Sequence, residues 1–215
     1  MLKLNYKKLL IKKKKIPITC LTAYSKPLAN ILDGNIDLIL IGDSLGTTLY
    51  GMQNTRGVTI EMMKNHGKAV VLNTKFSMTI IDMPYNTYRN KKEALKNALD
   101  ILAFTKADFI KIETDKKNID IVEHLTKNRI KVVSHIGVTP QKFSNFSRIK
   151  SVGKNIKDKN KLFNLAKKLE DAGSKMIVLE CIGIDTSKKI TNNLSIPTIG
   201  IGSSKYCDGQ VLVID

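Results

Sequence analysis

The strongest constraint on the fold of this chain is a regular alternation of short apolar runs with longer polar stretches. The apolar runs are rich in β-branched residues, and each is long enough for one strand only. They are apolar almost throughout, which is typical of strands covered on both faces in a parallel sheet. The predicted strands are Ile18–Thr22, Asp37–Gly42, Ser77–Asp82, Asp108–Glu113, Lys131–Ile136, Lys175–Cys181, Thr198–Gly202 and Gln210–Ile214.

The stretches between these strands are compatible with helices. Several are followed by glycine or asparagine, residues that commonly end a helix. The predicted helices are Lys26–Gly34, Thr59–Asn73, Lys91–Thr105, Ile119–Asn128, Lys159–Ala172 and Thr186–Asn193.

Successive β–α units predict an α/β fold of the (β/α)8 TIM-barrel type, as a single domain over residues 1–215. Residues 1–16, which include the lysine-rich stretch Lys7–Lys15, are expected to form a basic N-terminal arm or helix. The alternative is an open doubly wound sheet that binds nucleotides, but its signatures are missing. Gly200-Ile201-Gly202 follows a strand, yet Lys205 occupies the position of the third glycine in G-x-G-x-x-G.

The chain is strongly basic, with 36 Lys and Arg against 19 Asp and Glu, a net charge of +17 and a pI near 9.7. Such a charge can indicate nucleic-acid binding. However, only four of these 36 residues are Arg, the side chain that most often binds nucleic-acid bases and phosphates through paired hydrogen bonds. The lysines are scattered along the chain. Lys, Asn and Ile all have A+T-rich codons, so genome composition accounts for the excess. We therefore expect no nucleic acid as the main partner.

No apolar run approaches the roughly 20 residues that a membrane span requires, and the lysine-rich start does not resemble a signal peptide. The three cysteines, Cys20, Cys181 and Cys207, form an odd set without a C-x-x-C pair. They indicate reduced thiols. A cytoplasmic protein without membrane contact is expected.

Five successive predicted strands end in, or are followed closely by, a titratable side chain. In a parallel barrel, the carboxyl ends of the strands form the active site. Side chains alternate along a strand, so Lys111 and Glu113 point the same way. The residues at these strand ends are Asp43, Asp82, Glu113, His135 and Glu180.

Taken singly, these residues have ordinary structural explanations. Asp43 or Asp82 alone is more often a helix cap or turn residue, and His135 alone more often a core histidine. Glu113 and Glu180 are harder to explain in this way, because buried carboxylates need a partner or a cation. All five at one end of the barrel favour an active site.

The carboxylates favour Mg²⁺, which prefers oxygen ligands and completes its shell with water and substrate. Zinc is disfavoured, because the three histidines lack ligand spacing. A serine hydrolase is disfavoured as well, because Ser44 lies in G-D-S-L-G and not in G-x-S-x-G.

Several segments, in order from about Pro17 to the last residue, resemble the ketopantoate hydroxymethyltransferase family. The combination of G-D-S-L-G and H-I-G-V-T-P-Q is the specific part of this resemblance. The segments are Leu21–Tyr24, Ile41–Gly46, Asp82–Pro84, Lys111–Glu113, His135–Gln141, Leu179–Cys181, Ile196–Gly202 and Cys207–Val213.

This resemblance implies a barrel of the phosphoenolpyruvate/pyruvate superfamily type. It also implies the transfer of a hydroxymethyl group from 5,10-methylenetetrahydrofolate to 3-methyl-2-oxobutanoate, with Mg²⁺, in pantothenate and coenzyme A biosynthesis. This reaction implies small-molecule substrates. The family is typically decameric, so a homo-oligomer is implied as well.

The resemblance also assigns roles to individual residues. It makes Glu180 the base that removes the C3 proton of the oxoacid. The implied metal ligands are Asp43, Asp82 and Glu113, and the implied substrate-binding residues are Asp43, Ser44, Asp82, Lys111 and His135.

The sequence departs from the family pattern at several places. Ser25 replaces the Asp that follows T-A-Y, Ser147-Arg148-Ile149 replaces the Gly-Gly-Tyr of a flexible loop, and Ser203-Ser204 replaces Ala-Gly. The sequence ends at Asp215, so the final helix and C-terminal segment of the family are not expected, and strand 8 needs cover from a neighbouring copy. Two alternatives stay open: another Mg²⁺-dependent 2-oxoacid lyase or mutase of this superfamily, and a degraded, non-catalytic barrel.

Overall fold

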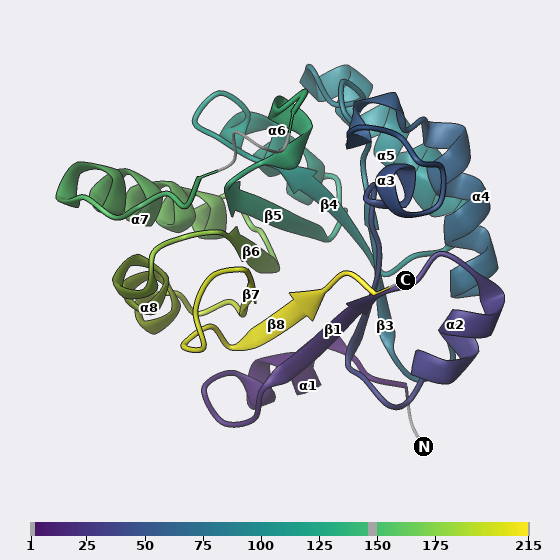
Figure 1. Cartoon of the computed structure of the whole chain (residues 1–215), viewed down its shortest axis with the longest axis horizontal. Helices are drawn as coiled ribbons and strands as arrows, with labels where there is room; N and C mark the ends of the chain where they lie inside the picture. The colour runs from purple at the N-terminus through teal and green to yellow at the C-terminus, as the bar shows by residue number, and fades with distance from the viewer. Residues whose placement is uncertain (1–2, 146–149, 215) are drawn as a thin grey trace.

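The computed structural model describes residues 3–145 and 150–214. Within them, eight parallel strands follow one another in sequence order around a closed barrel, and β8 pairs with β1 to complete it (Figure 1). The predicted TIM barrel is therefore confirmed. The strands are β1 (Ile18–Thr22), β2 (Leu38–Ile41), β3 (Met78–Asp82), β4 (Phe109–Glu113), β5 (Val132–Gly137), β6 (Met176–Glu180), β7 (Thr198–Ile201) and β8 (Gly209–Leu212).

Helices connect the strands along the outside of the barrel (Figure 1). The helix predicted from sequence as Lys159–Ala172 begins earlier in the structure, at Ile156. Asn155 caps it there by accepting a hydrogen bond from the backbone N–H of Asp158. The α-helices are α1 (Tyr6–Lys12), α2 (Lys26–Leu32), α3 (Leu45–Thr48), α4 (Ile60–Val71), α5 (Lys91–Thr105), α6 (Ile119–Lys127), α7 (Ile156–Asp171) and α8 (Ile184–Asn193), and the 3₁₀ turns are η1 (Thr55–Gly57) and η2 (Pro140–Lys142).

Two apolar clusters explain why the strand sequences are apolar almost throughout. In β2, Ile39 and Ile41 pack outward against the helices, whereas Leu38 and Leu40 pack into the barrel interior. Alternate side chains of a strand therefore enter different cores, and both faces are buried.

The N-terminal segment closes the amino end of the barrel. Leu9 of α1 is fully buried and belongs to the same cluster as the interior residues of the strands. The Tyr6 hydroxyl donates a hydrogen bond of 2.8 Å to the backbone carbonyl of Lys175. The stretch 1–16, expected to be a basic arm or helix, thus contains a short helix that packs as a floor under the barrel.

Acidic residues at the starts of β2, β4 and β8 receive the basic side chains of this segment. Asp37, Asp108 and Asp208 each accept hydrogen bonds from both the backbone N–H and the hydroxyl of a threonine on the preceding strand. The pairs with the N-terminal segment are Lys12–Asp37, Lys3–Asp108 and Lys13–Asp208, with N–O distances of 2.6, 3.2 and 2.7 Å. Part of the basic charge is therefore structural, since it neutralises strand-initiating carboxylates.

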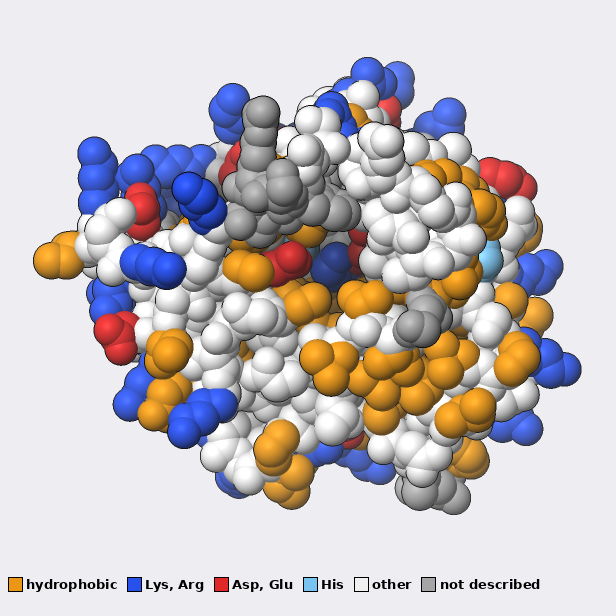
Figure 2. Space-filling model, in the orientation of Figure 1, with side chains coloured by type: hydrophobic (Ala, Val, Ile, Leu, Met, Phe, Trp, Pro, Cys, Tyr) orange, Lys and Arg blue, Asp and Glu red, His pale blue; other side chains and the backbone are white. Residues whose placement is uncertain are grey.

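No helix follows β8 within the described residues, so the outer side of this strand is exposed. Leu212 on this outer side is 60% exposed, whereas Val213, which follows the strand and is 45% exposed, lines the cavity at the strand ends. Figure 2 shows hydrophobic side chains gathered on the face in view, close to where Figure 1 places the chain end marked C. Among the described residues, none of the helices is both long and apolar enough to cross a bilayer.

Candidate active site

The seven residues predicted to act in the site line one cavity, at the carboxyl ends of the strands, with a volume of about 150 Å³. The face in view in Figure 2 is hollowed near its centre, and acidic and basic side chains lie inside the hollow. Asp82, Glu113 and Glu180 are the last residues of β3, β4 and β6. The seven residues are Asp43, Ser44, Asp82, Lys111, Glu113, His135 and Glu180.

Lys111 forms a buried ion pair with Asp82, with 2.7 Å between Nζ and Oδ1. Burial alone would lower the pKa of Lys111, but the carboxylates of Asp82 and Asp43 outweigh it and hold this pKa above its usual value. Lys111 is therefore charged. The two side chains meet because the parallel pairing of β3 with β4 puts Asp82 beside Lys111.

Asp43 and Glu113 are carboxyl groups with raised pKa values. Burial, followed by repulsion from Asp82, raises the pKa of Asp43 to about 7. Burial raises the pKa of Glu113 to about 8. A cation between these groups would favour their ionised forms and offset the cost of burying them.

Gln141 connects these two carboxyl groups. Its Nε2 donates to Asp43 Oδ2 at 2.7 Å and to the carbonyl of Met83 at 3.0 Å, while its backbone N–H donates to Glu113 Oε1 at 3.1 Å. The Tyr88 hydroxyl donates to Gln141 Oε1 at 2.5 Å, which fixes the orientation of the amide. Sequence reasoning missed this role, although Gln141 ends the H-I-G-V-T-P-Q segment.

His135 lies between two acids. Its Nε2 is 3.0 Å from Glu180 Oε2, and its Nδ1 is 4.0 Å from Glu113 Oε1. Burial lowers the pKa of His135, with Glu180 opposing the shift, so the ring is neutral near pH 7. Glu180 is the more accessible of the two acids, with 16% of its side chain exposed against 6% for Glu113.

Ser44 lies at the N-terminus of the four-residue helix α3, which the sequence did not predict. Its hydroxyl is 2.7 Å from the Tyr24 hydroxyl, a buried group that follows β1. This contact holds the Ser44 side chain at the wall of the cavity.

Four buried side-chain atoms in the described part of the chain lack a hydrogen-bond partner, and all four belong to residues that line this cavity. They are Thr55 Oγ1, Glu113 Oε2, His135 Nδ1 and His135 Nε2. His135 Nε2 is close to Glu180, but the contact lacks hydrogen-bond geometry. Buried polar atoms are almost always paired in folded proteins. Their concentration here indicates a cavity that is completed by a polar ligand.

The three candidate metal ligands fit a cation that keeps part of its own hydration. Within residues 3–145 and 150–214, no three His, Cys, Asp or Glu side chains already form a metal-binding group. Mg²⁺ is usually held by one or two carboxylates with waters and substrate, and not by an all-protein cage. The raised pKa values of Asp43 and Glu113, together with the unpartnered Glu113 Oε2, are what a site for such a cation requires.

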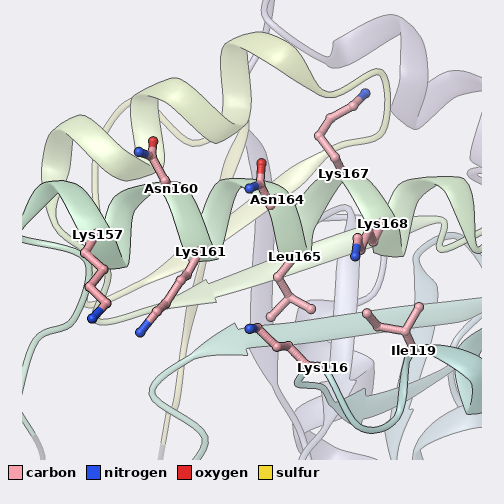
Figure 3. Close-up of a pocket in the computed structure, with 9 residues that line it drawn as sticks. All are labelled: Lys116, Ile119, Lys157, Asn160, Lys161, Asn164, Leu165, Lys167 and Lys168. Atoms are coloured by element: carbon pink, nitrogen blue, oxygen red, sulfur yellow. The ribbon is translucent and has the colours of Figure 1, made fainter.

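A second, larger cavity of about 600 Å³ lies outside the barrel along α7 (Figure 3). Among the described residues that line it, none is an acidic residue, a histidine or a cysteine. Lys157 and Lys161 extend from α7 on the same side as Lys116, and Leu165 points toward Ile119 (Figure 3). None of the seven predicted site residues lines this groove, so it is not the candidate active site.

A closed parallel barrel with acids, a lysine and a histidine at the carboxyl ends of its strands defines a TIM-barrel enzyme that acts on a small molecule. The sequence profile of ketopantoate hydroxymethyltransferase matches residues 3–215. The chain belongs to this family, and it is a transferase.

Two relatives show how close the similarity is. A 3-methyl-2-oxobutanoate hydroxymethyltransferase from Pelagibacter ubique (strain HTCC1062) is 50% identical over 204 residues, which cover 95% of this chain and 78% of the relative. The enzyme of the same name from Anaplasma marginale (strain St. Maries) is 42% identical over 198 residues, covering 92% of this chain and 72% of the relative.

Solved structures of the same fold are more distant in sequence. Phosphonopyruvate hydrolase, in a complex with oxalate and Mg²⁺, matches with a TM-score of 0.68 at 12% identity, covering 94% of this chain and 72% of that chain. A 2,3-dimethylmalate lyase of the PEP mutase/isocitrate lyase superfamily matches with a TM-score of 0.66 at 13% identity, covering 90% of this chain and 69% of that chain. At this identity the match establishes the barrel fold alone.

Proposed function

We propose that this chain transfers a hydroxymethyl group from 5,10-methylenetetrahydrofolate to 3-methyl-2-oxobutanoate, forming 2-dehydropantoate (ketopantoate) in the cytoplasm. The observation that carries the proposal is the cavity at the strand ends, where the seven predicted residues meet and where buried polar atoms lack partners. Family membership and the names of the relatives support the same reaction.

Asp43, Asp82 and Glu113 are the residues that would hold Mg²⁺. When bound, the ion would act as a Lewis acid that draws electron density from the carbonyl of the oxoacid and makes its C3 proton more acidic. The complex of phosphonopyruvate hydrolase with oxalate and Mg²⁺ supports the use of this metal in the fold. Each carboxylate already has an orienting contact, to Gln141 or Lys111, and this limits its movement.

Lys111 supplies the positive charge for the first chemical step. Glu180 removes the C3 proton, and negative charge then develops on the keto oxygen of the substrate. The ammonium group of Lys111 is permanently charged through its pair with Asp82 and would stabilise this developing charge. His135 lies 3.0 Å from Glu180, and because burial lowers its pKa the ring adds no positive charge beside this carboxylate.

The carbon nucleophile formed in this way attacks the methylene carbon carried by the folate. A bond forms between C3 and the methylene carbon, and water supplies the hydroxyl oxygen of the new hydroxymethyl group. Both C–N bonds of the methylene bridge break, and the two folate nitrogens keep the electron pairs and take up two protons, one from C3 through Glu180 and one from the water. Ser44 would hold the substrate carboxylate through its hydroxyl, which the contact with Tyr24 keeps at the cavity wall.

The test is product formation by the purified chain. With oxoacid, methylenetetrahydrofolate and Mg²⁺, we expect ketopantoate and an equal amount of tetrahydrofolate, and we expect chelator to abolish both. Cleavage of a 2-oxoacid without any need for folate would favour a lyase instead. No turnover at all, with retention on DNA that depends on salt, would favour a non-catalytic barrel.

We also propose that the working form is a homo-oligomer. The resemblance to a typically decameric family supports this, and Leu212, 60% exposed at the end of β8, is an apolar side chain that a neighbouring copy can bury. Light scattering at micromolar concentration should give a mass several times 24 kDa. A stable monomer with a cooperative melting transition would contradict this proposal.

A further inference from the structure

We infer that Thr55 is a substrate-binding residue whose hydroxyl donates a hydrogen bond to an oxygen of the bound 2-oxoacid. This inference rests on the proposed function, because it concerns the same cavity. Thr55 is 3% exposed and lines the cavity, and its Oγ1 has no partner among the described residues.

Each of the other hydroxyl groups in the cavity lining has a partner within the described part of the protein. Thr47 donates to the carbonyl of Ser44 at 2.9 Å, and the Ser44 hydroxyl contacts the Tyr24 hydroxyl at 2.7 Å. The Thr55 hydroxyl approaches Asp43 closely enough to lower the pKa of that carboxyl, but the contact lacks hydrogen-bond geometry. Thr55 therefore retains a donor and an acceptor for a ligand.

The turn that carries Thr55 is fastened on both sides. The Asn54 side chain accepts a bond from the backbone N–H of Arg56 at 3.0 Å and donates one to the carbonyl of Ser144 at 3.1 Å. The Arg56 guanidinium donates to the Tyr85 hydroxyl at 2.6 Å and lies 4.3 Å from the centre of its ring. These contacts hold η1 beside the cavity, where the Thr55 side chain is buried.

A buried hydroxyl without a partner destabilises the unliganded fold, whereas valine has nearly the same shape and no such cost. If the side chain only packed against its neighbours, valine would give a more stable fold than threonine at this position. A bound oxoacid would supply the missing hydrogen-bond partner, and this explains why a hydroxyl is present at this position. Thr55 therefore contributes to substrate binding and not only to packing.

The test compares Thr55→Val with Thr55→Ser, and uses Thr105→Val as the matched control. Thr105 is also buried, but its hydroxyl donates to the carbonyl of Ile101 at 2.8 Å, and it does not line the cavity. Calorimetry would measure the dissociation constant of 3-methyl-2-oxobutanoate with Mg²⁺ and without folate. The melting temperature of each variant would be measured without substrate.

We expect Thr55→Val to weaken oxoacid binding about 10-fold to 100-fold, the usual effect of losing a hydrogen bond to a charged group. Its melting temperature should equal or exceed that of the unaltered chain, and Thr55→Ser should restore most of the affinity. Thr105→Val should lower the melting temperature and leave the affinity unchanged.

Unchanged affinity in Thr55→Val would overturn the inference while leaving the proposed function intact. A lower melting temperature with unchanged affinity would show that the hydroxyl has a structural partner, and this too would overturn it. If the unaltered chain does not bind the oxoacid at all, the proposed function fails first, and the assignment of Thr55 fails with it.

Discussion

Replacing Lys13 with methionine should destabilise the barrel strongly, because it removes the cation from a buried ion pair at the barrel floor. The Lys13 side chain is 7% exposed and that of Asp208 is 1% exposed, with 2.7 Å between Nζ and Oδ2. Methionine keeps most of the aliphatic stem, so the change removes the charge and little packing. Asp208 would retain its hydrogen bonds from the backbone N–H groups of Lys14 and Thr198 and from the Thr198 hydroxyl.

The expected magnitude follows from these contacts. Removing one partner of a buried pair costs about 3–5 kcal/mol, and we take about 3 kcal/mol because Asp208 keeps three other hydrogen bonds. For a chain of this size, that loss corresponds to a decrease in melting temperature of about 6–12 °C.

Two other lysines of the same segment provide matched controls. The Lys3 side chain, paired with Asp108, is 51% exposed, so Lys3→Met should cost less than about 1 kcal/mol. The Lys12 side chain, paired with Asp37, is 23% exposed and should give an intermediate loss. Urea denaturation followed by circular dichroism would measure the free energy of unfolding of each variant. Equal losses in Lys3→Met and Lys13→Met would refute the argument from burial.

The remaining predictions concern the active site. Asp82→Asn should raise the Mg²⁺ concentration needed for half-maximal activity by about 10-fold or more, and an unchanged requirement in a titration would remove Asp82 from the metal site. Glu180→Gln should bind Mg²⁺ and oxoacid nearly normally yet slow exchange of the C3 proton in deuterated water about 10²–10⁴-fold, and normal exchange would make another residue, His135 first, the base. Because folding raises the pKa of Glu113 to about 8, the native state binds more protons than the unfolded chain from about pH 4.5 to 8, so metal-free stability should fall as pH rises. Urea unfolding in chelator should show a flatter pH dependence for Glu113→Gln, and identical slopes would contradict the raised pKa.

Much of the site was predictable because strand order alone brings it together. Once β3, β4 and β6 are recognised as parallel strands of one barrel, their last residues must lie at the same end. Asp82, Glu113 and Glu180 are therefore predicted from local apolar patterns, without any knowledge of side-chain contacts.

Other parts of the site could not be predicted in this way. Gln141 and Asp43 are 98 residues apart in sequence, and no local pattern signals their hydrogen bond. Thr55 lies in a turn between α3 and α4 that has no apolar periodicity, so nothing in the sequence separates it from an ordinary loop residue. The substitution Ser147-Arg148-Ile149, noted from sequence as a change in a flexible loop, lies outside the described residues.

The sequence by itself determined the barrel and the acids at its mouth, because both follow from short-range periodicity and from the order of the strands. Only the tertiary structure decided which charges are paired. The scattered lysines look alike in sequence, yet Lys13 neutralises Asp208 at the amino end of the barrel and Lys111 neutralises Asp82 in the candidate active site. The physical reason is that ion pairing and burial depend on distances between distant segments, which exist only after the strands have closed into a barrel.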